Sequence, residues 1–147
     1  MNIAIGGDPN AAGLKKIIIE HLEKTGHTCL DFGSEDVIYA NVAIAVAESV
    51  AAGNYDRGIL ICGTGIGMCI SANKVPGAYA AACYDPYSTE RSIKSNNVNI
   101  MTLGAFVTGH ELAKSLVDIW MAAEYVPGGR SEPKIQRIIE YSREHEK

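Results

Sequence analysis

The sequence predicts an α/β protein: an open three-layer α/β/α sandwich in which helices cover both faces of a parallel sheet. Short strand-like runs alternate with longer helical patterns, which is typical of βαβ units. The run Ile59-Leu60-Ile61 has no polar face, as expected for a central strand that is buried on both sides. The chain has 147 residues, of which 47% are apolar, and its composition shows no break. We therefore expect one domain over residues 1–147.

The first part of the chain is predicted to form three strands and two helices. Gly26 and Gly53 end the two helices. In the first helix, apolar and aromatic side chains recur with helical spacing at Leu14, Ile17, Ile18, His21 and Leu22. The predicted elements, in order, are strand Asn2–Gly6, helix Ala11–Thr25, strand Thr28–Asp31, helix Asn41–Ala52 and strand Arg57–Cys62.

The second part of the chain begins with a glycine-rich turn, Gly63–Gly67, and has a further turn at Lys74–Gly77. Pro127-Gly128-Gly129 then interrupts the chain. The charged C-terminal helix that follows, about Ser131–Glu146 (residues 131–146), is expected to pack on its own domain or on a partner subunit. The other predicted elements are a short helix through Asn73, strand Ala78–Cys83, helix Tyr87–Asn96, strand Asn99–Gly104 and helix Gly109–Ala123, which complete a five-stranded sheet.

Composition and charge exclude several classes of function. Thirteen Lys and Arg residues against seventeen Asp and Glu residues leave no basic surface for nucleic acid. The longest apolar stretches are too short to cross a bilayer, and Met1-Asn2-Ile3-Ala4 has no signal-peptide character. The four cysteines include no C-x-x-C pair and the four histidines are scattered, so no zinc motif is present. We expect a cytoplasmic protein with reduced thiols and no membrane partner.

Residues suited to chemistry occur close to three of the predicted strands. Asp8 follows the first strand, the segment 62–67 follows the third, and Asn96 to Asn99 lie just before the fifth. Ligands of open α/β sheets bind beyond the carboxyl ends of the strands. We therefore expect these three segments to converge on one site.

The loop Cys62-Gly63-Thr64-Gly65-Ile66-Gly67 can be interpreted in three ways. A dinucleotide fingerprint fits poorly, because Met68 stands where the third glycine belongs. A cradle of backbone amides for an anion fits better, with Cys62 beside it as a thiolate nucleophile or base, since a helix N-terminus favours the charged sulfur. The alternative is that Cys62 is a buried structural thiol. Cys29, Cys69 and Cys83 have no such glycine loop, and we expect them to be structural.

Beyond this loop, five stretches occur in an order that is specific to one family. The chain resembles the ribose-5-phosphate isomerase B and galactose-6-phosphate isomerase family over essentially its whole length. The matching stretches are Ile5-Gly6-Gly7-Asp8 with Leu14-Lys15, Ile61-Cys62-Gly63-Thr64-Gly65-Ile66-Gly67, Ala72-Asn73-Lys74-Val75-Pro76-Gly77, Asn96-Asn97-Val98-Asn99 and Gly128-Gly129-Arg130.

The resemblance implies a Rossmann-like fold, a homodimer with shared active sites, or a tetramer built from such dimers, and no metal or cofactor. It implies aldose–ketose interconversion of a sugar phosphate through a cis-enediolate. Cys62 takes the place of the base that moves a proton between C1 and C2. The implied anion hole comprises Gly63, Thr64, Gly65, Ile66 and Gly67. The implied substrate contacts are Asp8 and Asn96 for hydroxyls, Arg130 for phosphate, and Lys134 where the family usually has a second arginine.

Four positions depart from the family pattern. Pro9 and Ser131 replace histidines, and Phe106 replaces an arginine after the fifth strand. Ser95 replaces the histidine to which the family's ring opening is assigned. The proton-transfer residues are therefore present, whereas the ring-opening histidine and several phosphate contacts are not.

These departures leave the substrate open. Ribose 5-phosphate, converted to ribulose 5-phosphate, is the first expectation because it is the family default. A tetrose 4-phosphate is the alternative, because its blocked terminal oxygen prevents ring closure and no opening catalyst is needed. A third hypothesis is a sugar-phosphate-binding subunit without catalysis, since relatives include enzymes with unequal subunits.

On the C-terminal helix, Arg137 is expected to lie on a solvated face.

Overall fold

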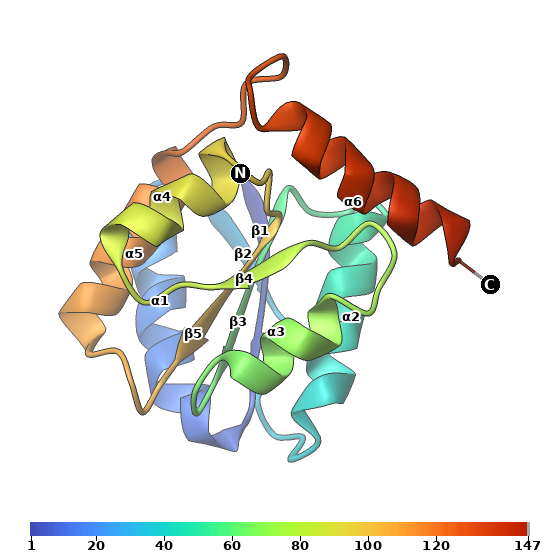
Figure 1. Ribbon diagram of the computed structural model, residues 1–147. Coiled ribbons are helices and arrows are strands. Elements are labelled where there is room, and N and C mark those ends of the chain that lie inside the picture. The colour runs from blue at the N-terminus through green and yellow to red at the C-terminus, as the bar shows by residue number, and fades with distance from the viewer. Residues whose placement is uncertain (147) are drawn as a thin grey trace.

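The computed structural model describes residues 1–146 and contains a five-stranded parallel sheet with the order β2-β1-β3-β5-β4 (Figure 1). The predicted parallel α/β architecture is therefore confirmed. Two strands have the predicted bounds, and the fourth is shorter because Asn73 holds the backbone at its start. The strands are β1 (Asn2–Gly7), β2 (Thr28–Asp31), β3 (Arg57–Cys62), β4 (Ala80–Ala82) and β5 (Ile100–Gly104).

The described part of the chain contains six α-helices, and their bounds agree with the predicted ones within one or two residues. Asp8 caps a short 3-10 turn, Pro9–Ala11, so the first α-helix begins one residue later than predicted. The fourth ends two residues early, and Asn97 then takes a left-handed conformation with φ 51°. The helices are α1 (Ala12–Lys24), α2 (Tyr39–Ala51), α3 (Ile66–Ala72), α4 (Pro86–Lys94), α5 (His110–Ala122) and α6 (Glu132–Glu144).

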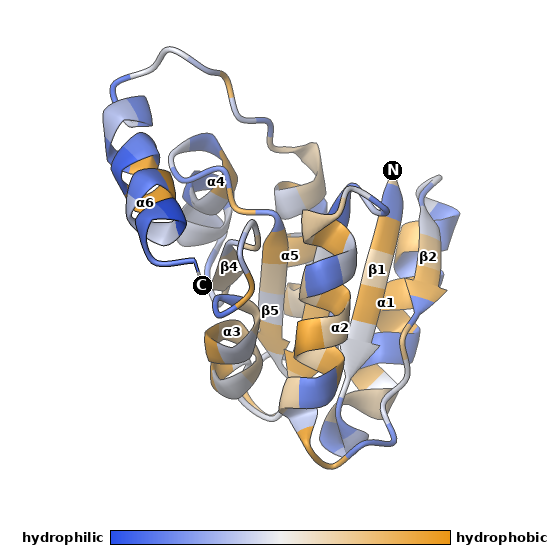
Figure 2. Cartoon of the chain, turned by 90° about the vertical axis from the view of Figure 1, so that its right-hand side faces the viewer, coloured by the Kyte–Doolittle hydropathy of each residue, from blue (hydrophilic) through white to orange (hydrophobic). Residues whose placement is uncertain are grey.

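The helices cover both faces of the sheet and form two apolar clusters. Helices α1, α4 and α5 contribute to the cluster on one face, whereas α2 and α3 contribute to the other (Figure 2). Strand β3 feeds both clusters, because Ile59 and Ile61 face the first and Leu60 and Cys62 face the second. The prediction of a central strand buried on both sides is confirmed. Cys62 thereby lies on the α2–α3 side of the sheet.

Helix α6 projects from the body of the molecule, next to α4 and the β4 edge of the sheet (Figures 1 and 2). Ile135 is its one buried residue, and Ile138 and Tyr141 are about half exposed. The predicted helix is confirmed with slightly tighter bounds. Within residues 1–146, no helix is long and apolar enough to span a membrane.

Candidate functional site

Cys62 is the last residue of β3 and lies at the start of the glycine loop, residues 63–67. Its sulfur accepts a hydrogen bond from the backbone N–H of Gly65 at 3.1 Å. The residue is 4% exposed, whereas Thr64, two residues further on, is exposed. An amide donor aimed at sulfur is suited to stabilise negative charge there. Cys62 therefore lies in the apolar cluster on the α2–α3 side of the sheet, directly below an exposed part of the loop.

Strand β5 holds the glycine loop in shape through its backbone and one side chain. The Thr102 hydroxyl donates to the Gly65 carbonyl at 2.8 Å, and the Phe106 N–H donates to the Gly63 carbonyl at 3.0 Å. Gly65 has φ 81°, a left-handed conformation that glycine adopts without penalty. Gly104 packs so tightly that a Cβ there would lie 2.7 Å from the backbone of Thr64. Side chains at these two glycines would displace the loop.

Asp8 lies beside Cys62 because β1 and β3 are neighbours in parallel register. Gly7 pairs with Ile61, and the Asp8 N–H donates to the Ile61 carbonyl at 3.2 Å. Asp8 is 7% exposed, and its carboxylate accepts hydrogen bonds from the backbone N–H and the side-chain amide of Asn10. Asp8, the predicted substrate contact, and Cys62, the predicted base, thus lie at the carboxyl ends of neighbouring strands of the sheet.

An ion pair behind Asp8 is a feature that sequence reasoning missed. The buried Lys15 ammonium lies 2.7 Å from the Asp31 carboxylate, which also accepts the Gly33 N–H at 2.8 Å. The Gly33 carbonyl in turn accepts the N–H of Gly7 at 3.0 Å. This chain of contacts fixes the backbone that leads into Asp8. The signal was available, because Lys15 shares helical spacing with the buried Ile18 and Leu22.

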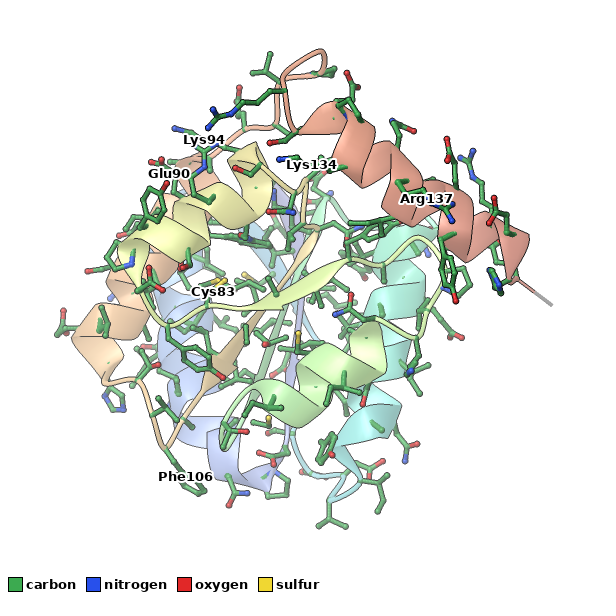
Figure 3. All side chains as sticks on the ribbon, viewed as in Figure 1. Cys83, Glu90, Lys94, Phe106, Lys134 and Arg137 are labelled. Carbon is green, nitrogen blue, oxygen red and sulfur yellow. The ribbon has the colours of Figure 1, made fainter. Side chains whose placement is uncertain are left out.

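Aromatic side chains surround the glycine loop. The ring of Phe106 lies against Gly63, and that of Tyr39 lies against Gly67. The Tyr84 hydroxyl donates to the Thr64 carbonyl. Burial, with a smaller contribution from nearby thiols, raises the pKa of Tyr84, so its phenol stays a neutral donor at neutral pH. Phe106 is 74% exposed and brings no charge to this edge (Figure 3).

The remaining cysteines have surroundings that suit structural thiols. Burial raises the pKa of Cys83 to about 11, and burial also raises the pKa of Cys29 to about 11. Burial raises the pKa of Cys69 as well, and its thiol donates to the Ala80 carbonyl. Thiols with raised pKa values carry little thiolate at neutral pH and are poor nucleophiles or bases. This agrees with their predicted structural role.

The expected convergence of three segments on one site is wrong within a single chain. Asn96 precedes β5, and Ile100 of that parallel strand pairs with Gly58, four residues before Cys62. At a rise of about 3.3 Å per residue, Asn96 therefore lies more than roughly 13 Å along the sheet from Cys62. A residue just before a strand lies at the amino edge of a parallel sheet, opposite Asp8 and the glycine loop.

Arg130 also lies at the amino edge, where it lines a polar cavity of about 320 Å³. This amino-edge cavity is lined by residues of α4 and of the segment that leads into α6. Two further cations, Arg91 and Lys94, line it together with Ser95, and sequence reasoning assigned a role to neither. Lys134 is exposed and is not among the lining residues, and Asn96 lines a neighbouring cavity along β4.

The chain is similar to known proteins over most of its length, and these matches show its family. The model of the Ribose/Galactose Isomerase family matches residues 3–138. The chain is 48% identical to a protein named ribose-5-P isomerase B from Listeria innocua, with 95% of this chain and 96% of that one covered. The chain belongs to the ribose/galactose isomerase family.

Other relatives widen the range of sugar phosphates within this family. The chain is 47% identical to the D-erythrulose-4-phosphate isomerase of Pectobacterium atrosepticum, over 96% of this chain and 95% of that one. It is also similar to the solved structure of Clostridium thermocellum ribose-5-phosphate isomerase B, with a TM-score of 0.94 and 42% identity over 99% of this chain and 100% of that one. The two sequence relatives differ in named substrate but are equally similar to this chain.

The family's proton-transfer chemistry needs a base beside donors that stabilise developing negative charge. The predicted base, Cys62, and the predicted anion hole of the glycine loop lie at one edge of the sheet, with Asp8 at the end of the neighbouring strand. Within the described residues, no group of three or more His, Cys, Asp and Glu side chains is arranged to hold a metal ion.

We predict that Gly104→Ala displaces the glycine loop. The new methyl group would meet the Thr64 backbone at 2.7 Å, and overpacking of this kind costs about 1–3 kcal/mol. The variant should lose free energy of unfolding in a urea titration and should also lose kcat. Gly13→Ala is the control, because nothing lies within 4 Å of its Cβ in α1. That change should raise stability by about 0.4–1 kcal/mol and leave kcat unchanged. Wild-type kcat in Gly104→Ala would contradict the proposed loop geometry.

Proposed function

We propose that the protein is an aldose–ketose isomerase of a sugar phosphate in which Cys62 is the base. The observation that carries this proposal is the Cys62 sulfur, 3.1 Å from the Gly65 amide of the glycine loop. Family membership supports the reaction, and the position of Asp8 next to this sulfur supports the binding of a substrate hydroxyl.

The proposed reaction moves one proton between two neighbouring carbons. The Cys62 thiolate removes the proton from C2 of the open-chain aldose, and the electron pair of the C–H bond passes to the C1 carbonyl oxygen. Amides of the glycine loop and the Thr64 hydroxyl stabilise the resulting enediolate. The thiol returns the proton to C1, and the proton of the C2 hydroxyl passes to the O1 oxyanion. The product is the ketose, with a C2 carbonyl and a C1 hydroxyl, and Cys62 is again a thiolate. The low exposure of Cys62 keeps bulk water from the base during transfer.

We further propose that the active site is shared between two copies of the chain. The substrate contacts Asn96 and Arg130 lie at the opposite edge of the sheet from Cys62, so one copy cannot bring them together. Helix α6 supports this proposal, because it projects from the body with Ile138 and Tyr141 half exposed. A second copy that packs on α6 could bring its glycine loop to the amino-edge cavity. The functional unit is then a homodimer with two equivalent sites.

Ribose 5-phosphate is the first candidate substrate. The Listeria innocua and Clostridium thermocellum relatives carry this sugar in their names and cover nearly the whole chain. Opening of the furanose ring would then fall to Ser95, Asp8 or water, since general acid–base help contributes only about 10²–10⁴-fold. The reaction would be a step of the pentose phosphate pathway, which we place in the cytoplasm.

A tetrose 4-phosphate is the second candidate, and the contact of Ser95 favours it. The Ser95 hydroxyl accepts a hydrogen bond from Arg91 Nε at 2.8 Å, and it offers no group that titrates near neutral pH. A four-carbon sugar with a terminal phosphate cannot close a furanose ring and needs no such group. The Pectobacterium atrosepticum relative named for D-erythrulose 4-phosphate supports the same candidate.

Replacement of the base tests the reaction. Cys62→Ala removes the only group proposed to accept the C2 proton and should lower kcat by several orders of magnitude, with the free energy of unfolding nearly unchanged. Exchange of the C2 proton with deuterated solvent, followed by NMR, should stop as well. Cys69→Ala is the matched control in α3 and should keep its turnover. Turnover near wild type in Cys62→Ala would show that Cys62 is not the base. If the unmodified protein exchanged no C2 proton with solvent, the protein would be better explained as a sugar-phosphate-binding subunit.

Steady-state kinetics with two sugars separates the candidate substrates. We expect kcat/KM to be higher for ribose 5-phosphate than for erythrose 4-phosphate. Ser95→His should raise the ratio of kcat/KM for the pentose to kcat/KM for the tetrose about tenfold or more, because only the pentose gains from a restored ring-opening acid–base group. A clear preference of the unmodified enzyme for the tetrose would replace the first candidate by the second.

Mixed dimers test the shared site. Cys62→Ala and Arg130→Ala each place a defect in every site, so each variant alone should have low kcat/KM. After the two are unfolded and refolded together, hybrid dimers would carry one intact and one doubly altered site. An equal mixture should recover about a quarter of the wild-type activity, because half of the dimers are hybrids with one working site. If both residues served a site within one chain, mixing would restore nothing.

A further inference from the structure

The amino-edge cavity holds more positive charge than the family pattern predicted. Arg91 and Lys94 from α4 line it together with Arg130, so three cations face one space of about 320 Å³. Glu132 is the acidic residue of the lining, and its carboxylate accepts the Gly128 N–H at 2.6 Å. The contact holds that carboxylate at the turn before α6. The cavity as a whole is therefore suited to an anion.

Arg91 is held in a fixed orientation within this cavity. Its Nε donates to the Ser95 hydroxyl at 2.8 Å, one turn further along α4. Its Nη1 lies 4.0 Å from the Glu90 carboxylate, which pairs more closely with Lys94 at 3.5 Å. The two terminal nitrogens of Arg91 therefore keep most of their hydrogen-bonding capacity. A planar guanidinium with two free N–H groups is the side chain best suited to bind two oxygens of a phosphate.

Lys134 is less well placed for this task. It is an exposed residue of α6 outside the cavity lining, although it lies toward the same end of the molecule as Lys94 (Figure 3). The family resemblance places a second arginine at its position, next to Arg130 in the phosphate contact. A lysine offers a point charge in place of a guanidinium fork. Arg91 supplies a fork in the same cavity as Arg130.

We propose that Arg91, positioned by Ser95, binds the substrate phosphate together with Arg130 and takes the role of the missing second arginine. The proposal rests on the proposed function, because the sugar reaches this cavity from the glycine loop of the partner subunit. It also assigns Ser95 a use: the serine anchors Arg91. The ligand is a phosphate monoester carried by the sugar, whichever chain length the enzyme prefers.

Arg91→Gln tests the proposal through the split between KM and kcat. Loss of a charged bidentate contact should raise KM for the sugar phosphate at least about tenfold, with kcat changed much less. The inhibition constant for inorganic phosphate should rise in parallel. Ser95→Ala should give a smaller rise in KM, because the guanidinium is retained but loses its anchor. Arg91→Lys should fall between Arg91→Gln and the unmodified enzyme, since it keeps the charge without the fork.

Arg137→Gln is the matched control. Arg137 lies on α6 outside the cavity lining and pairs with Glu140 and Glu144, so its loss should change neither KM nor phosphate inhibition. Calorimetric titration of Cys62→Ala with inorganic phosphate, with and without Arg91→Gln, measures anion binding apart from turnover. The Arg91→Gln background should bind phosphate at least about tenfold more weakly.

Three outcomes would count against the proposal in distinguishable ways. If Arg91→Gln leaves KM and phosphate affinity unchanged while Cys62→Ala abolishes turnover, the role of Arg91 is wrong and the proposed function stands. If phosphate affinity falls but KM does not, the cavity binds an anion other than the substrate, and the role of Arg91 is again wrong. If Cys62→Ala retains turnover, the proposed function itself fails.

Discussion

The close packing of Gly104 against the backbone of Thr64 is the contact on which the shape of the glycine loop depends. It brings the end of β5 and the residues after it near enough to donate hydrogen bonds to three carbonyls, at Cys62, Gly63 and Gly65. The Ala105 and Phe106 amides donate to Cys62 and Gly63, and the Thr102 hydroxyl donates to Gly65. These bonds fix the carbonyls of Cys62, Gly63 and Gly65, and with them the orientation of the neighbouring backbone amides. Such donors stabilise developing charge without reorganising first, which is the main source of electrostatic catalysis.

The parallel direction of the strands sets a second constraint. Every strand that ends at the glycine loop begins at the opposite edge, so residues before β5 and after α5 collect at the amino-edge cavity. One chain therefore presents the proposed base, Cys62, at one edge and the cations of the amino-edge cavity at the other. A short sugar phosphate carries its reacting carbonyl and its phosphate only a few bonds apart. The base and the cations must therefore lie within the length of that sugar. Two copies related by a twofold axis would bring the edges together twice, and α6 projects where it could pack on the second copy.

Much of the fold was predictable from the sequence because it follows from periodic apolar patterns. Helix and strand bounds agree within a few residues, and the shared edge of Asp8 and Cys62 follows from strand order. The prediction that Asn96 lies near Cys62 was wrong, because Asn96 precedes β5 whereas Asp8 and the glycine loop follow their strands. A residue before a parallel strand lies at the opposite edge of the sheet from a residue after one. Arg91 was missed for another reason. A charged residue on a short polar helix is typical of a solvated face. That Arg91 and Arg130 line one cavity depends on how α4 and the segment before α6 are placed in space.

The departure at Phe106 removes a positive charge from the glycine-loop edge of the sheet. Phe106 brings an exposed aromatic ring there, where the family pattern has arginine, whereas Arg91, Lys94 and Arg130 line the cavity at the amino edge. In a shared site, the phosphate would then be held mainly by the partner subunit, and the reacting carbons by the subunit that carries Cys62. A ligand that bridges two chains in this way binds the dimer and not the separated subunits. By mass action, substrate binding would then favour assembly, and this coupling would be stronger here than in relatives that keep a phosphate-binding arginine beside the base.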